Sequence, residues 1–484
     1  MRYLFIITVA LAALSLSGCS TNPATGATQF TALMSPEQEN QVGAEEHEKI
    51  LAQFGLYENQ AVQSYVSAVG QKVVADTERP DVEYKFFVLD SPVVNAFALP
   101  GGYIYITRGL LALANSEAEL ASVLGHEAGH ITGRHSAERY SRGVVTSLGS
   151  SILSAAIGQT GVSQALGLGS DLYLKSYSRS QENEADTLGI RYMARGGYDP
   201  RASTSFLTSL QRYSALENRL QGKEDSGASY FSTHPATDER VNKTRAETAA
   251  ATGGTVNRDG YLQKIDGIVY GDSARQGFVR ESESGSDFYH PGLGFTFHVP
   301  RGYQIANGAS EVVAVSKDGP IIIFDMAGNP NNMDAYTYLT QGWMNGEAKL
   351  TDPERITVNG MNAAAAAFNG QVNGKPATIR VVAIAYAPDR FARFQIAIPP
   401  GTAAGEMDDL KRATYSFRPL SASEKQQVRP YRIDIVPAGV NDTMAGLARQ
   451  MPFNDYKEER FAILNGLLPG APLQAGERYK MVVK

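Results

Sequence analysis

An HExxH run inside a predicted helix is the feature that most restricts what this 484-residue chain can form. It reads His126-Glu127-Ala128-Gly129-His130. Residues four apart lie on one face of a helix, so both imidazoles point the same way. Histidine is scarce, with 7 in the chain, which argues against a chance match. The pattern predicts a zinc site at which the metal polarises a water and Glu127 accepts its proton.

Catalytic zinc usually has three protein ligands, so the two histidines need a partner elsewhere. In the HExxHxxGxxH alternative, the third histidine falls at position 136, which is Ser136. His135 comes one residue early, and on a continuing helix it is turned roughly 100° away. That alternative is therefore rejected. We expect His135, like His47, His290 and His298, to be structural or exposed.

A second predicted helix, starting after Ser178 and capped with the help of Gln181, offers a glutamate as the third ligand. Glu182 and Asp186 are four residues apart and share a face. We assign Glu182 as the ligand and Asp186 as the carboxylate that fixes the tautomer of a ligand histidine. Glu184 projects to another side of the helix. The competing interpretation is a merely charged, solvated helix.

The two motifs together resemble a known family. GHEAGH followed by ENEAD is similar to the CAAX-prenyl-protease and HtpX-like family of zinc endopeptidases, whose pattern is HExxH and then ExxxD on a later helix. Segments 95–106 and 232–240, and Gly125 directly before the HExxH run, also match its soluble periplasmic lipoprotein branch. The resemblance covers about residues 36–250. It implies a mainly helical gluzincin domain that holds one Zn²⁺ per chain through His126, His130 and Glu182.

The resemblance also draws attention to two residues after the second helix. His234 is expected to reach the zinc as a fourth ligand, displacing the attacking water and silencing the site. A transition-state donor, or a loop histidine capped against Asp238, are the alternatives. Arg240 is expected to pair with a site carboxylate or to stabilise an oxyanion. An exposed surface arginine is the competing interpretation.

Residues 95–107 alternate apolar side chains around a Pro-Gly-Gly turn, which predicts a hairpin. In zincins an edge strand near the zinc helix binds the substrate as an added strand through main-chain hydrogen bonds. We assign that strand to 101–106, and name Gly101, Gly102, Tyr103 and Ile104 as its substrate-binding residues. Such binding reads backbone more than sequence, which suits unfolded substrates.

The N-terminal residues predict export and lipidation. Arg2 precedes an almost wholly apolar stretch at 4–16, and Leu16-Ser17-Gly18-Cys19 is a lipobox. The stretch is shorter than the ~20 residues that span a bilayer. Cys19 is the only cysteine, so lipidation is its one obvious use. Ser20 in place of aspartate favours, by analogy, a periplasmic protein anchored to the outer rather than the inner membrane of a Gram-negative cell.

Two further properties concern partners. A net charge of −6 and a pI near 5.8 argue against nucleic acid as a partner. The segment 143–170 has no charged residue and lies between the two zinc-bearing helices. We favour a lid or a surface that contacts the membrane or exposed apolar substrate, and the alternative is a small-residue helical hairpin or a mobile loop that packs near the cleft.

The whole chain is predicted to be an α+β multidomain protein. The zinc domain, with its small edge-strand sheet, is followed by an antiparallel α+β domain that weakly resembles the Mog1 and PsbP kind, and by a small LysM-like module. The boundaries are 1–18 signal peptide, 19–34 tether, 35–250 zinc metalloprotease domain, 251–286 linker, 287–420 accessory domain and 428–484 LysM-like module.

The LysM-like module is predicted from an order of strand, helix, L-N-x-L and final strand, with Asn441-Asp442-Thr443 where Gly-Asp-Thr is usual. The resemblance implies contact with peptidoglycan. A module of this shape that has lost glycan binding is the alternative.

These features together favour a zinc-dependent endopeptidase of the bacterial envelope that cleaves misfolded or stalled periplasmic and outer-membrane proteins. The first alternative is an envelope chaperone or assembly factor whose zinc site is mostly silenced by His234. The second is a cell-wall-tethered scaffold, against which the intact Glu127 argues.

Overall fold

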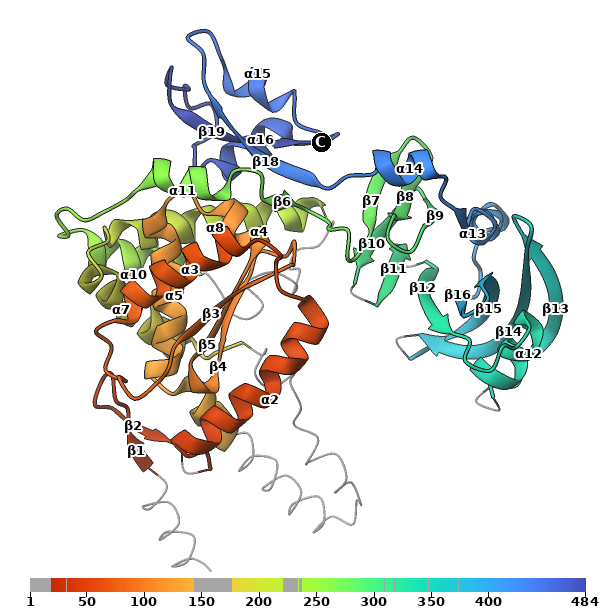
Figure 1. The fold of residues 1–484 in the computed structure, drawn as a ribbon, viewed down its shortest axis with the longest axis horizontal. Coiled ribbons are helices and arrows are strands. Elements are labelled where there is room, and N and C mark those ends of the chain that lie inside the picture. The colour runs from red at the N-terminus through yellow and green to blue at the C-terminus, as the bar shows by residue number, and fades with distance from the viewer. Residues whose placement is uncertain are drawn as a thin grey trace, which may run out of the picture. The chain divides into compact units, whose positions relative to one another are not determined.

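The structure is a computed structural model that describes residues 19–31, 33–142, 176–220, 234, 237–308, 310–316, 319–345, 348–372 and 374–484. The chain divides into two compact units. Unit 1 comprises Met1–Gly271 together with Arg432–Lys484, and unit 2 comprises Asp272–Tyr431 (Figure 1). Unit 2 is therefore an insertion in the sequence of unit 1.

Helix α5 (Glu117–Thr132), which carries the HExxH run, forms the centre of unit 1. It is buried along its whole length from Ala118 to Thr132, so it is a core helix and not a half-exposed amphipathic one. The helices that accompany it in unit 1 are α2 (Pro36–Phe54), α3 (Gln60–Val74), α4 (Arg108–Leu113), α7 (Arg179–Arg195), α8 (Arg201–Leu220), α10 (Asp238–Thr248) and α11 (Arg258–Ile265).

The starts of the two site helices follow from their capping residues. Ser116 Oγ accepts a hydrogen bond from Glu119 N at the start of α5. The predicted capping box of α7 is confirmed, because the side chains of Ser178 and Gln181 each accept from the other's backbone N–H.

A three-stranded sheet with the order β3-β5-β4 packs beside α5, as Figure 1 shows. Its strands are β3 (Lys85–Leu89), β4 (Ala96–Leu99) and β5 (Tyr103–Thr107). The prediction that 101–106 forms the edge strand is wrong. β3 adds to β5 in parallel, so Tyr103 and Ile104 lie in the central strand. Gly101 and Gly102 lie in the turn Pro100–Gly102 at φ of 78° and 95°, and β4 is the edge strand beside the zinc helix.

Residues 19–30 form an antiparallel hairpin of β1 (Cys19–Thr21) and β2 (Thr28–Phe30), so the predicted tether at 19–34 is wrong. Asn22, Gln29 and Met34 are buried. Polar side chains of this segment, such as Asn22 and Thr31, form hydrogen bonds with the rest of unit 1.

The predicted linker at 251–286 is also ordered. Helix α11 contacts α3 and α5, and β6 (Val269–Tyr270) joins a three-stranded sheet of order β19-β18-β6. The rest of that sheet comes from the C-terminal segment, which runs β18 (Tyr431–Pro437), α15 (Met444–Ala448), α16 (Lys457–Leu464) and β19 (Arg478–Val483). The strand, the first helix and the final strand were expected there, and α16 is an additional helix that ends at the start of the L-N-x-L motif; the LysM identity stays a prediction.

Unit 2 is built on antiparallel sheets, as predicted, but over 272–431 and not 287–420. One sheet has the order β10-β11-β12-β16-β15-β14-β13 and the other β17-β9-β8-β7. The strands are β7 (Phe278–Ser282), β8 (Gly285–His290), β9 (Phe295–Pro300), β10 (Tyr303–Asn307), β11 (Glu311–Ser316), β12 (Ile321–Gly328), β13 (Thr351–Val358), β14 (Met361–Val372), β15 (Lys375–Ala387), β16 (Arg390–Ile398) and β17 (Arg418–Pro419).

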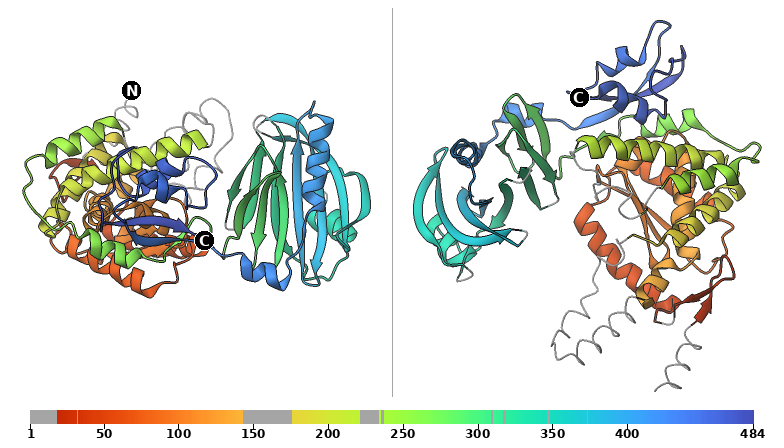
Figure 2. Two further views of the ribbon diagram at one scale, coloured as in Figure 1. Left: turned by 90° about the horizontal axis from the view of Figure 1, so that it is seen from above. Right: turned by 180° about the vertical axis from the view of Figure 1, so that it is seen from behind.

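The larger sheet of unit 2 is covered on both faces. Along β14, Ala363 and Ala365 belong to one core, whereas Ala364 and Ala366 belong to another, as the two-residue period of a strand requires. Helix α13 (Ala404–Tyr415) packs in the first core, on the concave side of the curved sheet in Figure 2. The predicted helix at 333–343 is present as α12 (Ala335–Thr337) and the π-helical turn η4 (Tyr338–Trp343), and the short helix α14 (Ala422–Gln427) follows β17.

Two predictions fall outside the described residues. They are the signal peptide at 1–18 and the whole of the uncharged segment at 143–170. Among the described residues, the helices are too short or too polar to cross a membrane.

Candidate metal centre

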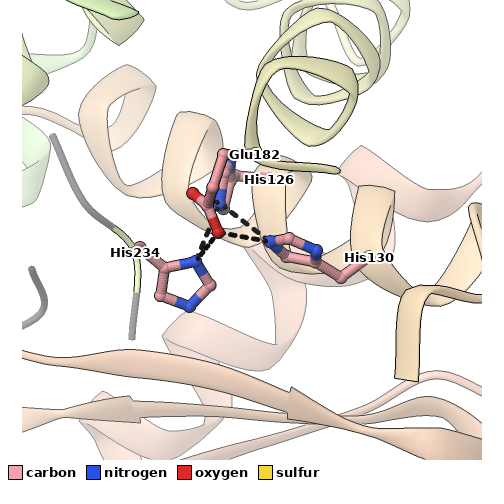
Figure 3. A group of neighbouring side chains, drawn as sticks. All are labelled: His126, His130, Glu182 and His234. Atoms are coloured by element: carbon pink, nitrogen blue, oxygen red, sulfur yellow. Dashed lines mark hydrogen bonds and ion pairs between the residues drawn. The ribbon is translucent and has the colours of Figure 1, made fainter. Parts of the chain in front are cut away.

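Four side chains from three parts of unit 1 converge on one point (Figure 3). They are His126 and His130 from α5, Glu182 from the first turn of α7, and His234. All four are buried, and their potential ligand atoms lie within 4.8 Å of one another. The structure therefore brings together the three predicted ligands and the residue expected as a fourth.

The spacing of these atoms fits zinc. Nitrogen and oxygen ligands bind zinc at about 2.0–2.2 Å in a tetrahedron, whose corners are then about 3.4 Å apart. His126 Nε2 lies 3.1 Å from His130 Nε2 and 3.3 Å from His234 Nδ1. Glu182 Oε1 lies 2.9 Å from His234 Nδ1 and 3.6 Å from His130 Nε2. Three imidazoles and one carboxylate are also donors that zinc prefers.

Glycines let the two helices of the site approach each other. A Cβ on Gly125 would lie 2.9 Å from the carbonyl oxygen of Gly189 in α7, and a Cβ on Gly129 would lie 3.0 Å from that of Ala185. Because these neighbours are backbone atoms, they cannot move aside cheaply. The glycines of the GHEAGH run thus set the distance at which Glu182 meets the two histidines.

Asp186 and Arg240 hold two of the predicted ligands from outside. Asp186 Oδ1 lies 2.9 Å from His126 Nδ1, which directs the Nε2 lone pair of His126 toward the other ligands. Arg240 is buried, and its Nη1 lies 2.8 Å from Glu182 Oε2, while Nε and Nη2 donate to the two oxygens of Asp186. Arg240 therefore contacts site carboxylates, as one of the predictions had it, and is not a surface residue.

Glu127 has the surroundings expected of a proton acceptor. It is fully buried, and within the described part of the chain neither carboxylate oxygen has a hydrogen-bond partner. His234 Nε2 lies 3.6 Å from its Oε1. Burial raises the pKa of Glu127, against the opposing charges of His234 and His126. A buried carboxylate beside a metal cluster can take up and release a proton.

The charged side chains around the site shift one another's pKa values. Burial would lower the pKa of His126, but the carboxylates of Asp186 and Glu182 outweigh it and raise that pKa to about 9. Burial also opposes the ionised form of Asp186, yet Arg240 and His126 lower its pKa to about 2. Likewise, His234, His126 and Arg240 overcome burial and hold the pKa of Glu182 well below its usual range. Glu182 and Asp186 are therefore anionic at neutral pH, which suits a dication.

Three neighbours of His130 were missed or misjudged from the sequence. His135, expected to be structural or exposed, is buried, which agrees with the first alternative, and its Nδ1 lies 2.8 Å from His130 Nδ1, a contact that was not predicted. Glu184, which was set aside, lies 3.3 Å from His135 Nε2. The ring of Tyr177 stacks on that of His130 with centroids 3.8 Å apart. No spacing signal marks Tyr177, whereas His135 lies within the HExxH neighbourhood.

Residues 60–248 match the model of Peptidase family M48. The beta-barrel assembly-enhancing protease of Yersinia pestis is 30% identical over 228 residues, covering 45% of each chain. The mitochondrial metalloendopeptidase OMA1 of Schizosaccharomyces pombe is 30% identical over 208 residues, covering 42% of this chain and 59% of that protein.

The matches are partial. The chain spans 38% to 59% of the length of the first curated relatives that it matches. Among solved structures, the cyanobacterial PsbP of Synechocystis sp. PCC 6803 has a TM-score of 0.22 and 11% identity, covering 32% of this chain and 98% of that chain. A likeness this low carries no argument about the fold, so the resemblance of unit 2 to the PsbP kind stays a prediction.

The family match covers α3, the zinc-bearing helices α5 and α7, and α10 with Arg240. It thus spans every residue of the four-donor cluster. Residues 60–248 of this chain thus match peptidase family M48 and bring together four donors of the kind that a zinc metallopeptidase needs.

Proposed function

We propose that this protein is a zinc-dependent endopeptidase of the bacterial envelope that acts on misfolded or stalled periplasmic and outer-membrane proteins. The observation that carries the proposal is the buried cluster of His126, His130, Glu182 and His234 with the buried carboxylate of Glu127 beside it. The names of the relatives, a beta-barrel assembly-enhancing protease and a metalloendopeptidase, support a protein substrate.

In the proposed reaction, zinc held by these residues would act as a Lewis acid toward the attacking water and the scissile carbonyl. Glu127 takes the proton of the attacking water on a carboxylate oxygen and then passes it to the nitrogen of the leaving amine. His126, His130 and Glu182 hold the metal. Asp186 keeps His126 in the Nδ1–H tautomer, and Arg240 keeps both carboxylates in place.

His234 is proposed to close the site in the state that the structure describes. Its Nδ1 lies close to ligand atoms on both helices, 3.3 Å from His126 Nε2 and 2.9 Å from Glu182 Oε1. A fourth protein ligand displaces the water that the reaction needs. Activity then requires His234 to withdraw. If it seldom withdraws, binding outweighs cleavage, which is the envelope chaperone or assembly-factor alternative.

The proposed substrate strand is β4, which replaces our assignment to 101–106. Within the described residues, β4 pairs on one side only, with β5, and packs against α5. A peptide that adds to it through main-chain hydrogen bonds would lie along the zinc helix. Recognition of this kind is compatible with many unfolded sequences.

The location is part of the proposal. The lipobox at Cys19 and the short apolar leader support a periplasmic protein held by lipid, at the outer membrane rather than the inner one. The LysM-like segment 428–484 supports contact with peptidoglycan. Cosedimentation of the purified chain with isolated cell-wall sacculi tests that contact; a chain that stays in the supernatant contradicts it.

The central test is cleavage of an unfolded model protein by chain purified from residue 20 onward, with zinc content measured for each variant. We expect wild type or His234→Ala to cleave, His234→Ala faster, and Glu127→Gln to bind zinc without cleaving. Glu48→Gln, an exposed glutamate of α2, controls for the first substitution. His290→Ala controls for the second, because His290, like His234, is followed by a proline.

Zinc-loaded wild type and His234→Ala that both fail to cleave would contradict the protease proposal. Rescue of a deletion strain by Glu127→Gln would then favour the chaperone alternative, because that variant keeps the metal but lacks the proton acceptor.

A further inference from the structure

The chain leaves the zinc helix abruptly after Gly133. Arg134 adopts a φ of 53°, in the left-handed region that a side chain disfavours. This turn breaks the helical register that would carry His135 away, and it folds the His135 ring back against Gly133. A Cβ on Gly133 would lie 2.5 Å from His135 Nε2, so only glycine leaves room for the ring there.

The N-terminal segment holds this strained turn in place. Arg134 donates from Nε to Glu39 Oε1 at 2.9 Å, from Nη1 to Thr31 Oγ1 at 3.2 Å, and from Nη2 to the carbonyl oxygen of Met34 at 2.7 Å. A residue in an unfavourable backbone region persists only when its surroundings over-determine it. Here those surroundings are residues that follow the hairpin of β1 and β2.

The hydrogen bonds beyond His130 have one consistent direction. His130 faces the other ligands through Nε2, so its proton is on Nδ1 and is donated to His135 Nδ1 at 2.8 Å. His135 then carries its own proton on Nε2 and donates it toward Glu184 Oε1 at 3.3 Å. Glu184 Oε1 is the acceptor at the end of this path and also accepts from Asn22 Nδ2.

Asn22, in the hairpin loop, completes the chain of hydrogen bonds. Its Nδ2 donates to Glu184 Oε1 at 2.6 Å, and its Oδ1 accepts from the backbone N–H groups of Ala24 and Thr25. Those two acceptor bonds fix the orientation of the amide, so its NH₂ group must face Glu184. Asn22 is 3% exposed, although it lies three residues after Cys19.

The arrangement makes the two ligand histidines unequal. His126 meets its carboxylate, Asp186, directly at 2.9 Å, whereas His130 reaches a carboxylate only through His135. We propose that the N-terminal hairpin is a working part of the metal centre, in which Asn22, Glu184 and His135 are positioning residues that orient His130 for zinc. This inference rests on the proposed zinc site but not on cleavage.

The test is zinc affinity, measured on the full mature chain by competition with a chelator of known Kd. Removal of a side chain that orients a ligand weakens metal binding by about 10–100-fold. We expect that loss for His135→Leu. His135→Gln, whose amide both accepts and donates, should stay within a few-fold of wild type. A merely structural ring would not be rescued in this way.

Asn22→Asp tests the hairpin itself. Aspartate has the same shape and still accepts from Ala24 and Thr25, but it replaces the donor toward Glu184 with an acceptor. We expect about tenfold weaker zinc binding and an altered visible spectrum of the Co²⁺-loaded protein, at an unfolding temperature close to that of wild type. Thr28→Ala, on the exposed side of the same hairpin, should change neither quantity.

The outcomes separate the two proposals. A folded Asn22→Asp or His135→Leu protein that binds zinc like wild type overturns the positioning role and leaves the zinc peptidase intact. If His135→Leu does not fold, Asn22→Asp and the comparison with His135→Gln still decide. A wild-type protein that binds no zinc overturns both proposals.

Discussion

Arg240 and Asp186 form a buried, two-pronged ion pair, with Nε 2.8 Å from Oδ2 and Nη2 2.7 Å from Oδ1. Through Nη1, the same guanidinium also meets Glu182. One cation from α10 thus holds both carboxylates of α7 that face the HExxH helix. Nε, Nη1 and Nη2 of Arg240 each contact one of these carboxylates. This argues that Arg240 positions the carboxylates and does not stabilise an oxyanion.

Replacement of Arg240 by leucine should therefore be severe. It leaves two buried carboxylates without their cation, which costs about 3–5 kcal/mol of unfolding free energy. Zinc affinity should fall with it, because Asp186 no longer holds His126. Chemical denaturation and chelator competition measure the two effects. Arg245→Leu, an exposed arginine of the same helix, should change neither; an Arg240→Leu protein as stable as wild type contradicts the assignment.

The glycine contact between α5 and α7 leads to a second prediction. In Gly125→Ala the new Cβ would meet the carbonyl oxygen of Gly189 at 2.9 Å, so the helices must separate. Glu182 then moves away from the two histidines, and we expect zinc affinity to drop at least tenfold. Gly405→Ala in α13, where a Cβ meets nothing within 4 Å, is the matched control. Unchanged zinc binding in Gly125→Ala would show that the helix distance does not set the site.

Gly133→Ala should resemble His135→Leu. The added Cβ displaces the His135 ring, so both substitutions remove the same hydrogen bond to His130. The double variant should therefore bind zinc about as weakly as either single one, because effects that act through one group do not add. The zinc affinities of wild type, the two single variants and the double variant form a complete double-mutant cycle. Additive losses would mean that Gly133 acts by another route.

Metal removal should affect one unit and spare the other. Zinc at about 100 times its Kd stabilises the state that binds it by about 2.7 kcal/mol. The cluster lies wholly in unit 1. Differential scanning calorimetry with and without a chelator should show a lower unfolding temperature for unit 1 and no shift for unit 2. A shift in both transitions would mean that the two units unfold together.

Lys480, from β19, connects the C-terminal segment to the end of helix α4, which precedes the HExxH helix. It is fully buried, and its Nζ donates to the carbonyl oxygens of Ala112, Leu113 and Ala114 at the end of α4. Lys480→Met should cost about 1–3 kcal/mol of unfolding free energy, since it leaves buried carbonyl oxygens without their donor. Thermal unfolding checks this, with exposed Lys484→Met as the control. No loss would mean that water replaces the ammonium group.

The parts of the site that were predictable are those set by local spacing. His126 with His130, and Glu182 with Asp186, each lie four apart on a helix, and a helix fixes their common direction before any tertiary contact forms. The contact of His135 with His130 was not predicted, because a continuing helix would turn His135 away. The left-handed turn at Arg134 depends on contacts with Thr31 and Glu39, which are far away in the sequence.

The errors in the fold have the same origin. The hairpin at 95–107 was predictable from its alternation and turn, but which strand lies at the edge depends on β3, which pairs in parallel with β5. The segment around Asn22 has the composition of a solvated tether, and its burial follows only from partners such as Glu184. Parallel pairing and side-chain docking leave no periodic trace in the sequence.

The insertion of unit 2 affects the order in which the protein can be completed on the ribosome. Lys480 is 368 residues downstream of Ala112, which it contacts. At synthesis rates of about 5–20 residues per second, the HExxH helix emerges roughly 20–70 s before that lysine. During this interval unit 2 is made and the carbonyl oxygens beside the helix lack their donor. The end of α4 therefore gains its last hydrogen-bond donors only after the whole of unit 2 has been synthesised.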